Sequence, residues 1–237
     1  MTLEYPTPAE AAVVRAAEQF MEETMANFSD PSHDPHHVRR VRRTALRLAR
    51  SVSDTGAAPD LLTVELGALL HDILDKKYVP PASYGHDARA FFEPFFRRVA
   101  AAAALDLRAD GRADAVVRIV ENVSWSNEQR LRARGEWGPW HEACVELHCV
   151  QDADRLDAIG AFGVMRCAAY SAVAKRALHA PDGDPDQPES AIQHFHDKLL
   201  HIQERMKTAP GKQMAEKRHK LLVDFLAAVE DEYGRDA

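Results

Sequence analysis

A histidine and an aspartate stand side by side at the end of an apolar run, as His71 and Asp72 within residues 69–75. Both side chains can bind a metal ion, and a protein rarely places two such groups against its core unless something there satisfies them. Two further segments carry similar residues, one at 33–41 and one at 151–160. Together they give the order histidine, histidine–aspartate, aspartate, which favours one metal centre assembled from three parts of the chain.

The ligand types indicate which metals would bind. His37, His71, Asp72 and one aspartate of residues 152–157 would supply two imidazoles and two carboxylates. This mixed set suits Mn, Fe, Co, Ni or Zn, whereas Mg prefers oxygen ligands throughout. Four protein ligands leave two positions open on an octahedral ion, and a water bound there becomes a nucleophile near neutral pH. We therefore expect one divalent transition metal and a hydrolytic reaction.

The downstream segment offers three aspartates, Asp152, Asp154 and Asp157. On a helix, Asp152 and Asp154 point about 200° apart, so they do not easily line the same ion. Asp154 and Asp157 are three residues apart and share a face. Asp152 falls nearer the apolar side of the helix, where a buried carboxylate needs a partner, so it is the main alternative to Asp154 as a metal ligand.

Three motifs, His37-x-x-Arg-Val, His71-Asp72 and Asp152-Ala-Asp-Arg-Leu-Asp-Ala, resemble those of the HD-domain metal-dependent phosphohydrolases. They are most similar to a small subgroup that carries the whole downstream signature. Further segments resemble this subgroup as well, and the likeness extends roughly over residues 30–230; these segments are 121–126, 194–200 and 206–209. In the family, the aspartate of an Ala-Asp-x-Leu segment binds the metal. The resemblance therefore implies the ligand set His37, His71, Asp72 and Asp154.

Asp75 and Lys76 lie three and four residues after Asp72, about one helical turn further on. In some family members an acidic residue at this place positions or deprotonates the attacking water, which implies a catalytic role for Asp75. General-base assistance of this kind contributes about 10²–10⁴-fold to the rate. The alternative for Asp75 is a solvated aspartate at a helix end. Lys76 would either contact a substrate phosphate or place positive charge at a helix C-terminus.

Two other cations are candidates for substrate binding. Arg40 lies one turn from His37, and arginine can hold a phosphate through two parallel hydrogen bonds. The alternative for Arg40 is a structural ion pair with a nearby aspartate. Lys198 lies in a segment that resembles the subgroup, which makes it a phosphate contact or, equally, a solvated surface lysine.

The remaining histidines give no clear second metal site. His86, His141 and His148 are the candidates, but dinuclear family members carry a recognisable series of extra histidines that cannot be placed here. A mononuclear centre is therefore the better hypothesis. His33 and Asp34 flank the site and would orient His37.

Composition limits the possible partners. The chain has 237 residues, of which 46% are hydrophobic and 28% charged, and its net charge is −7. This acidic balance argues against broad binding to nucleic acid or to an anionic membrane. Three cysteines without paired spacing indicate reduced thiols in a cytoplasmic protein. No apolar signal segment and no run of about 18 apolar residues is present.

Apolar residues recur with helical spacing nearly everywhere, and no alternating strand pattern appears. The caps and breakers predict one all-α HD domain over residues 1–237, with its core at about 30–230 and an N-terminal helix packed on it. Pro94 is expected to kink or split the fourth helix, and Gly160 or Gly163 to bend the long sixth one. The expected helices are 8–27, 36–52, 60–72, 87–105, 113–123, 141–175, 190–208 and 210–234.

The resemblance implies hydrolysis of a small phosphorylated substrate, in first place a nucleoside triphosphate, with release of pyrophosphate. A nucleoside 5′-monophosphatase is the second hypothesis, and hydrolysis of cyclic nucleotides or guanosine tetraphosphate is a third. A protein that binds metal or nucleotide without turnover is the alternative from a different class. The fold and the metal do not choose among these reactions, because substrate choice depends on the pocket.

Overall fold

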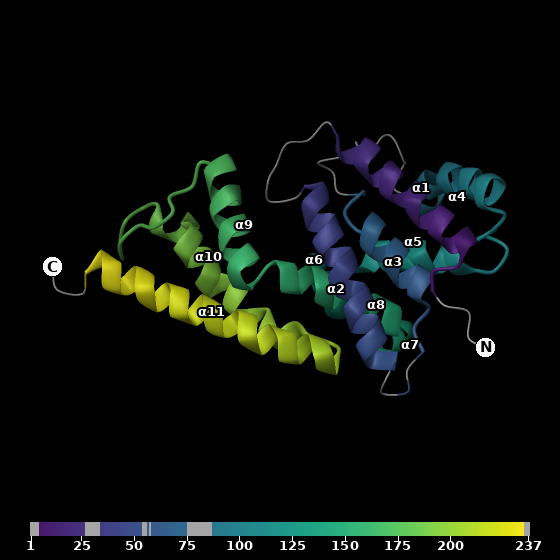
Figure 1. The fold of residues 1–237 in the computed structure, drawn as a ribbon. Helices are drawn as coiled ribbons and strands as arrows, with labels where there is room; N and C mark the ends of the chain where they lie inside the picture. Colours follow the sequence, from purple (N-terminus) through teal and green to yellow (C-terminus); the bar gives the residue numbers. More distant parts are fainter. Residues whose placement is uncertain (1–4, 27–33, 54–55, 57, 75–86, 235–237) are drawn as a thin grey trace. The chain divides into compact units, whose positions relative to one another are not determined.

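The computed structural model describes residues 5–26, 34–53, 56, 58–74 and 87–234. Within these ranges the chain forms helices and loops and contains no β-strand (Figure 1). The prediction of an all-α fold is therefore confirmed. The chain separates into two compact units, one of residues 1–29 and 34–151, the other of residues 30–33 and 152–237. The organisation as a single domain stays a prediction.

The first unit begins with two helices whose ends the sequence marks clearly. Thr7 caps α1: its hydroxyl accepts a hydrogen bond from the Glu10 amide at 3.3 Å, and the Glu10 carboxylate accepts one from the Thr7 amide at 2.8 Å. Asp60 caps α3 by accepting a hydrogen bond from the Thr63 amide at 2.7 Å. The helices of this unit are α1 (Pro8–Met25), α2 (Pro35–Ser53), α3 (Leu61–Leu70), α4 (Ala88–Ala103), α5 (Arg112–Asn122), α6 (Trp125–Ala133) and α7 (Pro139–Ala143).

Helix α3 lies at the centre of the first unit and is buried on all sides after its first residue. Aromatic residues of α4 and methionines of α1 pack in the same core, including Phe92, Phe95 and Met21. Each such side chain contributes about 1.5–3 kcal/mol when it is fully buried. Gly67 allows a close approach to α5, because a Cβ atom there would lie 3.0 Å from Ile119. This packing fixes the helix that leads to His71.

The sequence predicted that Pro94 would either kink α4 or split it into two helices. Helix α4 runs through Pro94 as one helix, so a split into two helices is wrong. A proline inside a helix removes only one amide donor, and its neighbours here are anchored by burial. Phe92, Phe95 and Phe96 are all at most 2% exposed and hold both halves of α4 against the core.

Helix α8 (Val145–Asp157) continues from the first unit into the second. The long helix expected over 141–175 is wrong at its start, because Cys144 has an extended backbone with ψ 98° and separates α7 from α8. It is interrupted again at 158–159, next to Gly160, whose φ of +74° favours glycine. The break near Gly160 therefore agrees with the expected bend. The second unit also holds α9 (Gly160–Val173), η2 (Gln187–Glu189), α10 (Ala191–Asp197), η3 (Leu199–His201), η4 (Gln203–Arg205) and α11 (Ala209–Tyr233).

Ser190 caps α10 as expected, but the helix ends much earlier than 208. Lys198 leaves the α-helical region with φ −135° and ψ −52°, and two 3₁₀ turns follow. Thr208 then caps α11, and its hydroxyl accepts a hydrogen bond from the Gly211 amide at 3.0 Å. The expected single helix over 190–208 is therefore wrong in its second half.

Among the residues that the structure describes, no single helix has the length and hydropathy needed to cross a membrane. Only α8 and α9 taken together as a bent pair reach that threshold.

Candidate metal centre

His37 is presented by the first turn of α2. Asp34 accepts a hydrogen bond from the His37 amide at 2.8 Å, which is the contact of a helix cap with the third helical residue. This contact fixes the backbone from which the His37 side chain projects. The imidazole is 0% exposed, whereas His36 beside it is exposed. Asp34 therefore orients His37 through the backbone, and His33 lies outside the described residues.

His71 follows α3 directly and is 8% exposed. Its Nδ1 atom lies 2.8 Å from the carbonyl oxygen of Ala68. Because a carbonyl can only accept a hydrogen bond, Nδ1 must carry the hydrogen. In the neutral imidazole the lone pair is then on Nε2, the atom nearest Asp72. A backbone acceptor of this kind is a common way to orient a histidine that binds a metal.

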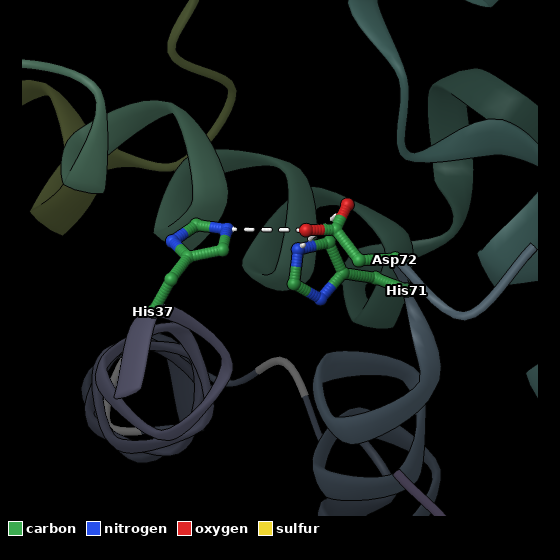
Figure 2. A group of neighbouring side chains, drawn as sticks. All are labelled: His37, His71 and Asp72. Carbon is green, nitrogen blue, oxygen red and sulfur yellow. Dashed lines mark ion pairs between the residues drawn. The ribbon is translucent and has the colours of Figure 1, made fainter. Parts of the chain in front are cut away.

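The Asp72 carboxylate faces both imidazoles, with one oxygen directed to each ring (Figure 2). Its Oδ2 atom is 3.5 Å from His37 Nε2, and its Oδ1 atom is 3.4 Å from His71 Nε2. The two rings lie 5.3 Å apart at an angle of 70°. One ligand atom from each of the three residues falls within 4.8 Å of the others. The structure thus brings together three of the four predicted ligands in one unit.

The donor set and its spacing fit a divalent transition metal. Two imidazole nitrogens and a carboxylate oxygen are the mixed ligands that such ions prefer. The distances of 3.4 and 3.5 Å between nitrogen and oxygen exceed the 2.7–3.2 Å of an ordinary hydrogen bond. The tautomer imposed by Ala68 leaves His71 Nε2 able to bind a cation. The cluster is therefore better suited to a shared metal than to a simple histidine–aspartate hydrogen bond.

The three aspartates of the downstream segment differ in their surroundings within the second unit. Asp152 is 0% exposed and accepts hydrogen bonds from the Lys207 amide, the Thr208 amide and the Thr208 hydroxyl at 2.7–2.8 Å. Burial raises the pKa of Asp152, and these hydrogen bonds oppose that rise. Asp157 pairs with Arg166 at 3.2 Å. Asp152 and Asp157 thus hold α8 against other elements of the unit.

The Asp152 side chain also limits how closely α11 packs against α8. A Cβ atom at Gly211 would lie 2.3 Å from Asp152 Oδ2, so no larger residue fits there without a shift. Arg155 strengthens the same junction by donating to the Arg205 carbonyl at 2.7 Å. Asp154 is half-buried on α8 amid these contacts, and it acts electrostatically on Lys198.

The predicted catalytic and substrate-binding residues belong to different units or lie outside the described residues. Arg40 is half-buried on α2 in the first unit, one turn from His37. Lys198 follows α10 in the second unit, where burial lowers the pKa of its ammonium group and Asp154 opposes that change. Asp75 and Lys76 lie outside the described residues.

His141 and His148 have structural contacts in the first unit. The Gly138 amide donates to His141 Nδ1 at 3.1 Å, so His141 Nε2 carries the hydrogen and donates to the Asn122 side chain at 3.2 Å. Burial is the largest cause of the lowered pKa of His141. His148 Nε2 lies 2.8 Å from the His141 carbonyl and donates to it. His86 lies outside the described residues.

Comparison with known proteins identifies the family of this chain. Residues 36–159 match the model of the HD domain, and this range includes both histidines and both aspartates of the predicted ligand set. The chain belongs to the HD domain family. A relative in Bacillus subtilis, named uncharacterized protein YpgQ, is 30% identical over 219 residues, which cover 92% of this chain and 93% of YpgQ.

Solved structures show the same HD fold. The crystal structure of Bacillus subtilis YpgQ in complex with ADP aligns with a TM-score of 0.64 at 24% identity, over 92% of this chain and 97% of that one. A protein from Bacillus thuringiensis named as an HD-superfamily hydrolase aligns with a TM-score of 0.70 at 24% identity, over 96% of this chain and 100% of that one. These likenesses show that the chain has the fold of the HD domain family.

The sequence does not reveal the hydrogen-bond acceptor that orients His71 in this HD domain. The Ala68 carbonyl that orients His71 is a backbone atom, and no residue type marks it. Only the prediction that α3 ends at His71 would place a carbonyl three residues earlier within reach of that ring.

Proposed function

We propose that this chain is a metal-dependent nucleotide pyrophosphohydrolase, of the HD subgroup with the Asp-Ala-Asp-Arg-Leu-Asp-Ala signature. It would convert a nucleoside triphosphate into a monophosphate and pyrophosphate. The observation that supports a hydrolase most strongly is the convergence of His37, His71 and Asp72 inside an HD domain. The ADP held by the related YpgQ supports a nucleotide as the ligand class.

The proposed ligand set is His37, His71, Asp72 and Asp154. Asp154 is favoured over Asp152 because the Asp152 carboxylate already accepts three hydrogen bonds at the start of α11. A carboxylate that is satisfied in this way would have to break those contacts to bind a metal. The metal would be one of Mn, Fe, Co, Ni or Zn, with Mg less suited to the nitrogen ligands.

A bound divalent ion would supply an activated water and a Lewis acid at one phosphoryl group. The protein residues have separate tasks around it. Ala68 keeps the proton of His71 on Nδ1, so that its Nε2 stays available. We assign Asp75 to holding the attacking water and accepting its proton. Arg40, Lys76 and Lys198 would neutralise the phosphate charges.

The choice of bond follows from the leaving group. Water oxygen would form a bond to the α-phosphorus while the bond from that phosphorus to the bridging oxygen breaks. Pyrophosphate is a far more stable anion than an alkoxide, so its departure needs less help from a general acid. The sequence motifs supply no strong general acid, which favours release of pyrophosphate over cleavage of a monophosphate.

A screen of nucleoside mono-, di- and triphosphates with manganese-loaded protein tests this proposal. Phosphorus NMR should detect nucleoside monophosphate and pyrophosphate from triphosphates. Orthophosphate from monophosphates, with triphosphates left intact, would instead identify a nucleoside 5′-monophosphatase. Binding of nucleotide with no product of either kind would identify a protein without turnover.

The same assay tests the role of Arg40. Because a charge-assisted hydrogen bond contributes about 1.5–3 kcal/mol, Arg40→Ala should lower turnover of the triphosphate by about tenfold or more. Arg47→Ala is a matched control, since Arg47 is an exposed arginine on the same face of α2, two turns further on. Equal activity of the Arg40 and Arg47 variants would remove Arg40 from the substrate site.

A further inference from the structure

Polar contacts link the segments of α2 and α3 at the candidate metal centre and also at a point away from it. At the first, His37 near the start of α2 lies against Asp72, just beyond the end of α3. At the second, Arg42 of α2 contacts Glu65 of α3. Arg42 lies five residues after His37, and Glu65 lies seven residues before Asp72. The contacts advance in opposite directions, so the two helices run antiparallel. The Arg42–Glu65 pair is thus a second cross-link between the two segments that carry the ligands.

Glu65 is an unusual residue for its surroundings. It lies in the apolar sequence of α3, and its side chain is 4% exposed. Arg42 contacts its Oε1 atom through both Nε at 2.7 Å and Nη2 at 2.6 Å. The hydroxyl of Tyr5 donates to the other oxygen, Oε2. A buried charge pair rarely adds more stability than an apolar pair of similar size, and its best-attested use is to fix one register.

The same arginine connects this pair to α1. Arg42 Nη1 donates to Glu18 Oε2 at 2.9 Å, while Arg39 Nε donates to Glu18 Oε1 at 3.1 Å. Arg42 therefore bridges two carboxylates with one planar group, which a lysine cannot reproduce because its ammonium is a single point of charge. Tyr5 and Glu18 both precede residue 36, where the match to the HD domain begins.

The register of the two helices matters because metal ligands tolerate little movement. The nitrogen and oxygen atoms of His37 and Asp72 are 3.5 Å apart, whereas a slip by one helical turn moves a residue by about 5.4 Å. The other residues of α3 are mostly aliphatic, and aliphatic contacts specify a register less strictly than a paired charge.

We propose that the Arg42–Glu65 pair, braced by Tyr5 and Glu18, is a positioning device that sets the register of α2 against α3 and thereby the metal affinity of the centre. This inference rests on the proposed function in that it takes the cluster of His37, His71 and Asp72 to bind a metal. Tyr5 and Glu18 would then help to position the metal ligands, although both residues precede the part of the chain that matches the HD domain.

Calorimetric titration of the metal-free protein with Mn²⁺ or Co²⁺ alone tests this inference. Glu65→Gln and Arg42→Lys should each weaken metal binding by about tenfold, the low end of the effect of residues that orient metal ligands. Tyr5→Phe removes only one hydroxyl and should weaken metal binding by a few-fold. This milder variant tests the inference if the other two do not fold. The visible spectrum of bound Co²⁺ should change in Glu65→Gln, because the ligands are displaced.

Two controls separate positioning from general loss of stability. Glu93→Gln makes the same chemical change in an ion pair of α4, where Glu93 contacts Arg108 at 3.3 Å. Phe96→Leu loosens the core of α4 without touching an ion pair. Both should lower the melting temperature yet keep the metal affinity and the Co²⁺ spectrum of the wild type.

The outcomes distinguish this inference from the proposed function. If Phe96→Leu weakens metal binding as much as Glu65→Gln at equal loss of melting temperature, the pair has no specific positioning role. If Glu65→Gln, Arg42→Lys and Tyr5→Phe all retain wild-type affinity and spectrum, the inference alone is overturned. If the wild-type protein binds no metal, the proposed function is rejected together with it.

Discussion

Replacement of His71 by alanine is expected to abolish both metal binding and turnover while the helices remain. The imidazole is one of two nitrogen ligands, and its neighbour Asp72 should give the same result when changed to alanine. The apolar faces that build the core lie on α1, α3, α4 and α5 and do not depend on these side chains. Elemental analysis should show a fall from about one equivalent of metal per chain to near zero. Circular dichroism should show unchanged helix content.

His36→Ala is the matched control for this experiment. His36 is the exposed neighbour of His37, so its loss removes one histidine but no proposed ligand. It should keep wild-type metal content and turnover. Turnover that persists in metal-depleted His71→Ala or Asp72→Ala would end the interpretation as a metal hydrolase.

Asp154 and Asp152 should give opposite results when each is changed to asparagine. Asp154→Asn is expected to remove most of the bound metal with little change in melting temperature, because it removes a proposed ligand. Asp152→Asn is expected to keep about one equivalent of metal but to destabilise the fold by about 1.5–3 kcal/mol. Both Asp152 oxygens accept hydrogen bonds from Lys207 and Thr208. The asparagine side chain would place an NH₂ group, which is itself a donor, against one of these donors.

Metal content and melting temperature of the two variants provide the measurement. The assignment of Asp154 is wrong if Asp152→Asn loses the metal and Asp154→Asn retains it. Thr208→Val refines the comparison, because it removes one donor to Asp152 and the cap of α11 but none of the proposed ligands. It should lower the melting temperature in the same direction as Asp152→Asn and leave the metal in place.

Features set by neighbouring residues could be predicted well from the sequence. Thr7, Asp60 and Ser190 cap helices as expected, because a short polar side chain needs only an amide three residues away. Thr208 caps α11, although it was expected to end the preceding helix. The helical phase of α2 also separates buried His37 from exposed His36. Local rules of this kind were sufficient for the all-α fold. The convergence of His37, His71 and Asp72 was expected instead from the order of the three segments and from the family resemblance.

Features set by distant residues could not be predicted. The partners of Asp152 are Lys207 and Thr208, 55 and 56 residues later, so only the tertiary structure shows that this carboxylate is satisfied. The early end of α10 at Asp197 likewise has no proline or glycine to mark it. Glu65 is a different case, because a lone charge in an apolar helix is visible in the sequence and indicates a buried partner, although not which one.

The central claim is that one divalent ion makes this chain a nucleotide hydrolase, and a metal titration tests it most directly. Metal-free protein is titrated with Mn²⁺ while pyrophosphate release from a nucleoside triphosphate is followed. We expect activity to rise in proportion to bound metal and to saturate at about one equivalent per chain. Full activity in the presence of a chelator, or activity that appears only with a second equivalent, would contradict this claim.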